Sequence, residues 1–205
     1  MPTRIMHPAR SLKFLLASSS PYRYKLLQQL IPQFEQASPD IDESALDGES
    51  AEQLVIRLSR AKALALKSDY PDHVIIASDQ VALLENQYST ILTKPLDEIN
   101  AFNQLKQCSG KQVLFLTGLS VIAPGCEQMT ECDVNEVQFR HLSDEQIKHY
   151  IKTEKPLDCA GSFKVEALGI SLFSKLSGKD PNALVGLPLI TLNQILFNLG
   201  IDTLA

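Results

Sequence analysis

The chain has 205 residues, of which 44% are hydrophobic and 21% charged, so it can bury one substantial core. Its formal net charge of −5 at pH 7 argues against a nucleic-acid partner. No apolar run is long enough to span a membrane, which argues against a membrane partner. Four cysteines at irregular spacings predict reduced thiols, as expected for a cytoplasmic protein (Cys108, Cys126, Cys132 and Cys159).

Strand and helix patterns alternate along the chain. In order, we expect a strand over 13–17, a helix over 20–31, a strand over 33–37, a helix near 50–68, strands near 73–78, 81–84 and 90–92, a helix near 97–107, strands over 113–122 and 134–139, a helix from 143, a strand around 170–176 and a last helix near 188–199. This mix predicts an α/β protein with a mixed, twisted sheet flanked by helices. No repeat or linker interrupts it, so we expect one domain over 13–205 after a flexible extension over 1–12.

Three local patterns refine these elements. Ile99, Phe102 and Leu105 recur at helical spacing and predict the apolar face of the helix near 97–107. The Pro-Gly pair at 124–125 predicts the turn of a hairpin. Residues 143–146 begin with serine and end with glutamine, which predicts a capping box at a helix start.

The most informative stretch is LLASSSPYRYKLLQQL, residues 15–30, where a strand ends in three serines and a helix begins. Ser20 is a good N-cap and Pro21 suits the first helical position. Ser18, Ser20 and the dipole of the helix start predict a phosphate-binding turn, to which Arg23 adds positive charge. An ordinary capped helix after a strand is the alternative.

Asp79 stands inside the apolar run HVIIASDQVALL, residues 73–84. An acid in such a run is costly to bury without a partner. It indicates either a carboxylate that caps a turn or an acid held at a cleft, where it binds a metal ion or takes a proton from water. We favour the cleft, because Ser78, Asp79 and Gln80 place three polar groups in a row.

Four further polar residues have ordinary alternatives when each is taken alone. Glu43 belongs to the acidic loop ASPDIDES, which is typical of a solvated surface. Lys62 lies in RLSRAKALALK, an amphipathic helix whose polar face needs no further role. Lys164 and Glu166 lie in CAGSFKVEALGI, where a surface turn is the alternative.

These segments, in this order, resemble the Maf family of nucleotide pyrophosphatases. The resemblance covers nearly the whole chain and implies a Maf/ITPase-like fold with two lobes around a cleft. It also implies hydrolysis of a nucleoside triphosphate to the monophosphate and diphosphate with Mg²⁺ or Mn²⁺, and a possible homodimer. The matching segments are ASSSPYRYKLL (17–27), DIDES (40–44), RAKA (60–63), SDQV (78–81), TKP (93–95), SGKQVLFLTGL (109–119), CAGSFKVEALG (159–169) and DPNALVGLPL (180–189).

The resemblance assigns roles to the polar residues. Asp79 is implied as the general base or a metal ligand, and Glu43 as a second partner of the metal or the phosphates. Three phosphates carry about four negative charges, so the site needs cations around them. Four residues are candidates for this part: Arg23, Lys62, Lys94 and Lys164.

SDQV together with GSFKVE resembles the subgroup that hydrolyses 7-methyl-GTP. Guanine methylated at N7 is cationic, so Tyr22 can stack on it and Glu166 can accept from N1–H and the exocyclic amine. Gln80 is expected to position the base or the water, and first-turn packing is the alternative for Tyr22. Two other functions stay open: a broader pyrophosphatase acting on dTTP, UTP or other modified nucleotides, and a nucleotide sensor without turnover.

Three departures from the family pattern lie in loops or first turns. Tyr24 replaces the second basic residue of the serine-rich motif, which leaves one phosphate contact in question. Thr93 replaces a glycine before Lys94. The segment 85–90 is longer than the usual tight turn and has no glycine.

Overall fold

The computed structural model describes residues 12–84 and 90–204, so the extension over 1–12 and the loop over 85–90 lie almost wholly outside the described residues. Seven strands of the described part form one mixed sheet in the order β2-β1-β3-β5-β6-β7, with β4 beside β3. Strands β2, β1 and β3 run parallel, and the remaining pairs are antiparallel. The strands are β1 (Lys13–Ala17), β2 (Glu35–Ala37), β3 (His73–Leu84), β4 (Thr90–Leu92), β5 (Gln112–Ile122), β6 (Met129–Phe139) and β7 (Phe173–Gly178).

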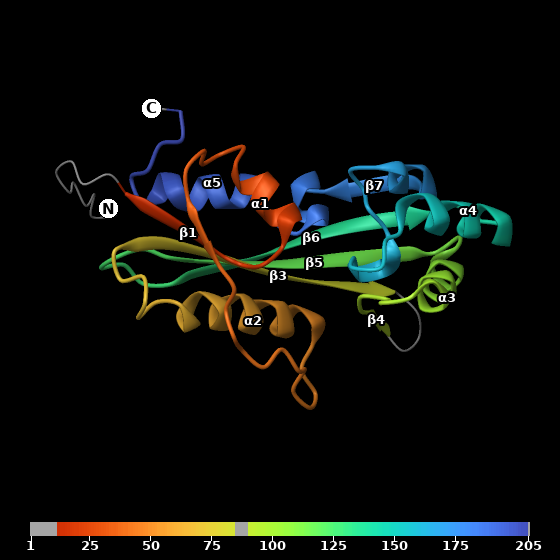
Figure 1. The fold of residues 1–205 in the computed structure, drawn as a ribbon, viewed down its shortest axis with the longest axis horizontal. Coiled ribbons are helices and arrows are strands. Elements are labelled where there is room, and N and C mark those ends of the chain that lie inside the picture. Colours follow the sequence, from red (N-terminus) through yellow and green to blue (C-terminus); the bar gives the residue numbers. More distant parts are fainter. Residues whose placement is uncertain (1–11, 85–89, 205) are drawn as a thin grey trace.

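Helices cover both faces of this sheet. Helices α1 and α5 lie on one face and α2 on the other, while α3 and α4 lie toward the end that holds β4 and β7 (Figure 1). None of the described helices is long and apolar enough to cross a membrane. The helices are α1 (Pro21–Leu27), α2 (Ala51–Ala65), α3 (Glu98–Cys108), α4 (Asp144–Glu154) and α5 (Leu189–Asn198), with short 3₁₀ helices η1 (Ala160–Ser162), η2 (Leu168–Leu172) and η3 (Pro181–Val185).

Strands β3, β5 and β6 run along the length of the molecule, from one end toward the other (Figure 1). We call the part with α1, α2, α5, β1 and β2 the first half, and the part with α3, α4, β4, β7, η1 and η2 the second half. In the first half, alternate residues of β3 face opposite layers, Ile76 toward α1 and α5 and Ile75 toward α2. In the second half, Phe115, Phe139 and Phe163 pack edge to face in one core.

Most predicted elements are confirmed, with shifted ends. The capping box of α4 is present, and the β5–β6 hairpin turns at Gly125, whose φ of +75° suits glycine. Two strands expected at 73–78 and 81–84 are one continuous strand, β3, which passes straight through Asp79. Residues 168–172 form η2, so β7 begins only at Phe173.

The predicted apolar face of α3 is wrong at one position. Ile99 is 75% exposed, and the buried face consists of Ala101, Leu105 and Cys108. These three also recur at helical spacing, and they are the ones that join the core of the second half. All four cysteines are free, as expected from their spacing.

Candidate active site

A pocket of about 130 Å³ opens between the two halves. Helix α1, the middle of β3, the turn after β4, the segment 158–166 and η3 all contribute to its walls. The pocket brings together six residues that the sequence analysis singled out: Ser20, Tyr22, Arg23, Gln80, Lys94 and Glu166.

The acid in the middle of β3 forms a buried ion pair with α2. Lys62 Nζ lies 2.6 Å from Asp79 Oδ1 and 3.0 Å from Glu43 Oε1. The side chains of Lys62 and Asp79 are 8% and 9% exposed, whereas that of Glu43 is 57% exposed. Lys62 therefore does not lie on a solvent-facing helix surface, and the ordinary amphipathic-helix interpretation is wrong for it. A buried charge persists only when it is paired, and Asp79 and Lys62 pair with each other.

A glycine lets α2 come close enough for this pair to form. Gly118 of β5 is directly opposite Asp79 of β3, so both positions face α2. A Cβ on Gly118 would lie only 2.3 Å from the carbonyl oxygen of Val55 in α2. The absence of a side chain at Gly118 thus sets the distance between helix and sheet, and with it the reach of Lys62 to Asp79.

Arg23 connects the pocket to this ion pair. Ser20 caps α1 by accepting from the backbone N–H of Arg23 at 3.3 Å, which confirms the predicted N-cap. Arg23 Nε donates to the carbonyl of Gly186 at 2.9 Å, and Nη1 approaches Ser18 Oγ at 3.5 Å. Burial lowers the pKa of Arg23, while the charges of Asp79 and Glu43 raise it. The guanidinium therefore lies within the electrostatic reach of both carboxylates.

The sequence analysis named Ser78 and Gln80 but missed that, together with Thr117, they hold η3 in place. The Ser78 hydroxyl lies 2.7 Å from the carbonyl oxygen of Gly118 and 2.8 Å from that of Gly186. Gln80 Nε2 donates to the carbonyl of Ala183 at 2.6 Å and to Thr117 Oγ1 at 3.0 Å. The only sequence signal was the presence of hydroxyl residues in otherwise apolar strands, which does not reveal their partners.

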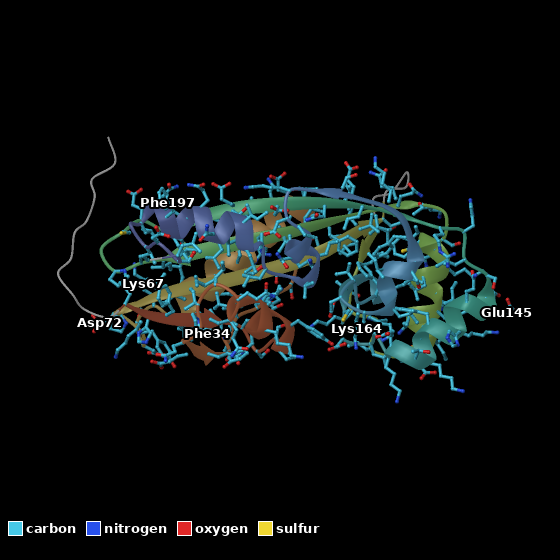
Figure 2. The ribbon with its side chains drawn as sticks, turned by 90° about the horizontal axis from the view of Figure 1, so that it is seen from above. Phe34, Lys67, Asp72, Glu145, Lys164 and Phe197 are labelled. Atoms are coloured by element: carbon cyan, nitrogen blue, oxygen red, sulfur yellow. The ribbon has the colours of Figure 1, made fainter. Side chains whose placement is uncertain are left out.

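Tyr22 forms the aromatic wall of the pocket. Its hydroxyl donates to Asp158 Oδ2 at 3.1 Å, and burial, together with the negative charges nearby, raises the pKa of Tyr22. Lys164 Nζ lies 5.9 Å from the centre of the Tyr22 ring and donates to the carbonyl of Glu154 at 3.0 Å. Figure 2 shows Lys164 where the two halves face each other. These contacts group Lys164 with the aromatic wall rather than with Lys62.

Tyr24, the departure from the family motif, has a packing role. Its ring centre lies 4.7 Å from that of Phe34, and it packs against the core under α1. The side chain that replaces the second basic residue therefore stabilises the junction of α1 and β2.

The two carboxylates that contact Lys62 are suitable ligands for one divalent cation such as Mg²⁺. Within residues 12–84 and 90–204, no group of three or more His, Cys, Asp or Glu side chains could hold a metal ion. Asp79 and Glu43, however, already direct carboxylate oxygens at a common cationic atom, Lys62 Nζ. Mg²⁺ commonly binds through one or two carboxylates plus substrate phosphates and water, so this pair fits such an ion when a triphosphate supplies further oxygens.

An arginine and a lysine that line a tyrosine-walled pocket can neutralise the charge of a phosphorylated small molecule, and a buried acid–lysine pair lies within electrostatic reach of that arginine. The chain belongs to the Maf family, because the pattern of that family, described as Maf-like protein, matches residues 13–199.

Two relatives match over nearly the full length. The chain is 51% identical over 189 residues to the 7-methyl-GTP pyrophosphatase of Pseudomonas aeruginosa, covering 92% of this chain and 97% of that protein. It is 53% identical over 190 residues to the 7-methyl-GTP pyrophosphatase of Alcanivorax borkumensis, covering 92% and 94%.

Two solved structures align with the chain at low sequence identity. A HAM1 protein from Coxiella burnetii aligns with a TM-score of 0.45 and 15% identity over 62% of this chain and 73% of that one. The Ham1 protein of Staphylococcus aureus aligns with a TM-score of 0.43 and 14% identity over 77% and 89%.

Proposed function

We propose that this chain hydrolyses 7-methyl-GTP to 7-methyl-GMP and diphosphate. Its membership of the Maf family and the names of both full-length relatives support this activity. The observation that carries the proposal is the Lys62 ammonium held between Asp79 and Glu43, with both carboxylates in electrostatic reach of Arg23, which lines a pocket together with Tyr22 and Glu166.

The phosphates are assigned to the cationic side of the site. Arg23, Lys62 and Lys94 neutralise the triphosphate and hold it so that one water lies in line with the α-phosphorus. Asp79 accepts a proton from this water as its oxygen bonds to the α-phosphorus. The bond between the α-phosphorus and the bridging oxygen breaks, and that oxygen leaves with the diphosphate.

Asp79 and Glu43 are also the residues that hold a divalent cation, Mg²⁺ or Mn²⁺, in this proposal. When bound, such an ion supplies charge neutralisation at the phosphate oxygens. Lys62 Nζ contacts both carboxylates, so a divalent cation that binds them would take over their neutralisation and leave the ammonium to pair with the phosphates.

The base is assigned to the wall formed by Tyr22 and Glu166. The Tyr22 ring stacks on the cationic methylated guanine, and Glu166 accepts from its N1–H and exocyclic amine. The amide nitrogen of Gln80 is engaged by Ala183 and Thr117, so Gln80 acts chiefly by fixing η3 beside the base.

The test compares two chemically equal substitutions at similarly buried aspartates. Asp79 and Asp133 are 6% and 5% exposed, and both lie on central strands of the sheet. We expect Asp79→Asn to lower kcat for 7-methyl-GTP at least about 100-fold, as is usual for loss of a general base. Asp133→Asn, which changes no group of the pocket, is expected to keep turnover.

Diphosphate release is measured with 7-methyl-GTP, GTP, dTTP and UTP, in Mg²⁺ or Mn²⁺, and folding is followed by circular dichroism. Wild-type turnover in Asp79→Asn would remove Asp79 from the mechanism. A higher kcat/KM for dTTP or UTP than for 7-methyl-GTP would support the broader pyrophosphatase. Nucleotide binding with no diphosphate from any substrate would support the sensor.

A further inference from the structure

A second carboxylate lines the pocket beside Glu166. Asp158 follows α4 and precedes η1, and it is exposed to solvent at the pocket wall. Both of its oxygens contact pocket residues: Oδ2 accepts from the Tyr22 hydroxyl at 3.1 Å, and Oδ1 accepts from the Cys159 thiol at 3.5 Å. Nothing in the local sequence marks Asp158, because an acid in a turn is ordinarily a solvated residue.

The bond between Tyr22 and Asp158 connects the two halves of the molecule. Tyr22 belongs to α1, whereas Asp158 lies 136 positions further along the chain. A tyrosine hydroxyl carries its proton at neutral pH, and the raised pKa of Tyr22 is in the same direction, so this hydroxyl is the donor. The Tyr22 ring is thereby fixed at its position in the pocket wall.

The face of this ring already has a positive charge near it. Lys164 Nζ lies 5.9 Å from the ring centre, within the range of a cation–π contact. An aromatic ring with a carboxylate at its hydroxyl end attracts cations more strongly than an isolated ring does. The wall of Tyr22 and Asp158 therefore suits a flat ligand that is itself positively charged.

The negative charges of Asp158 and Glu166 both act on the Cys159 side chain. Both charges help to raise the pKa of the Cys159 thiol to about 12, after the larger effect of burial. Cys159 is therefore a neutral thiol, and both carboxylates line the pocket within electrostatic reach of it. Arg23, by contrast, is near Asp79 and Glu43. Lys164 also acts on the Cys159 thiol, and its charge lowers the pKa of Cys159, so the wall around Cys159 combines two carboxylates with one ammonium.

We propose that Asp158 is a specificity-determining residue, which holds the Tyr22 ring and adds a second negative charge that favours a cationic, N7-methylated purine over the neutral purine. This inference rests on the proposed function, and it adds to the part assigned to Glu166. It separates into two effects, charge and positioning, and different substitutions remove them one at a time.

Asp158→Asn removes the charge but keeps an amide oxygen that accepts from Tyr22. We expect the ratio of kcat/KM for 7-methyl-GTP to that for GTP to fall about 3- to 5-fold, the size of an exposed charge contact. The fall in the ratio is expected to come from a higher KM for 7-methyl-GTP, and it shrinks at high ionic strength because salt screens exposed charges. A residue with a purely structural role would move both substrates alike.

Tyr22→Phe removes the hydroxyl bond and keeps both carboxylates. We expect KM to rise for both nucleotides while their ratio stays within about twofold of wild type, since the charge at Asp158 persists. Asp158→Ala removes both effects, so KM rises for both nucleotides and the ratio also falls. Asp144→Asn is the matched control, because Asp144 is an exposed acid on α4 that pairs with Lys106 outside the pocket.

An unchanged ratio in Asp158→Asn, in a wild-type background that hydrolyses 7-methyl-GTP, overturns this inference and leaves the proposed function standing. A wild-type chain that releases no diphosphate from 7-methyl-GTP overturns the proposed function itself, and the inference with it. A ratio that falls equally in Asp144→Asn also overturns the inference, because the effect would then come from net charge alone.

Discussion

Replacing Gly118 by alanine tests how closely α2 must pack on the sheet. The added Cβ would lie 2.3 Å from the Val55 carbonyl oxygen and 2.7 Å from its carbonyl carbon, both backbone atoms that cannot turn aside. Restoring an ordinary contact requires α2 to move about 1 Å away from β5. Lys62 lies two turns further along the same helix, so the same movement draws its ammonium away from Asp79.

Two magnitudes follow. Overpacking of this kind costs about 1–3 kcal/mol of unfolding free energy, and a loss of 2 kcal/mol lowers Tm by about 4–8 °C in a chain of this size. A displacement of about 1 Å at a catalytic group lowers kcat by about 100-fold. We therefore expect Gly118→Ala to remain folded at 25 °C yet to lose most of its diphosphate release.

Gly125→Ala is the control. Gly125 has φ of +75° and open space around it, so alanine there costs about 1–2 kcal/mol of backbone strain without touching α2. Thermal unfolding and steady-state kinetics are measured on both variants. The reasoning is refuted if Gly118→Ala keeps wild-type kcat, or if Gly125→Ala loses as much activity as Gly118→Ala.

Three further outcomes are expected. Lys62→Met leaves Asp79 buried without its partner and lowers the unfolding free energy by about 3–5 kcal/mol in urea titrations; a loss below about 1 kcal/mol contradicts the buried pair. Burial, and then the charge of Asp180, raises the pKa of Asp133 in the folded chain above its unfolded value. The stability that protonated Asp133 contributes is complete below the unfolded pKa and is lost as pH rises through the folded one. The Tm of Asp133→Asn should therefore gain on that of wild type as pH rises above about 4; a constant difference contradicts the shift. Removal of divalent cations with EDTA should abolish diphosphate release and leave Tm within about 1 °C, since Lys62 already neutralises the carboxylates; turnover in EDTA excludes the cation.

The sequence predicted Asp79 as a central residue of the proposed site because an acid inside an apolar run is visible along one strand. The apolar run around it is a local pattern, and the helix cap at Ser20 is local as well. The burial of Lys62 and its pairing with Asp79 were not visible in this way. Its helix shows an ordinary alternation of polar and apolar residues, and only the approach of α2 at Gly118 turns one polar position inward.

Partners that are distant in sequence escaped prediction. The Gly186 carbonyl is 108 positions from Ser78 and 163 from Arg23, and no local pattern indicates which carbonyl a buried hydroxyl or guanidinium will reach. Asp158 was missed for the same reason. The flexible extension, the single domain, the homodimer and the cytoplasmic location remain predictions, because no described contact bears on them.

Both walls of the pocket are attached to the same long strands. At about 3.3 Å a residue, the twelve residues of β3 extend about 40 Å, from under α1 to the core around Phe115. Rotating one half against the other would break the backbone ladders of β3, β5 and β6, so these described strands resist a hinge motion between the halves. Nucleotide entry and product release then depend on local motion of rim side chains and of the turns that carry them, over a sheet that keeps its shape.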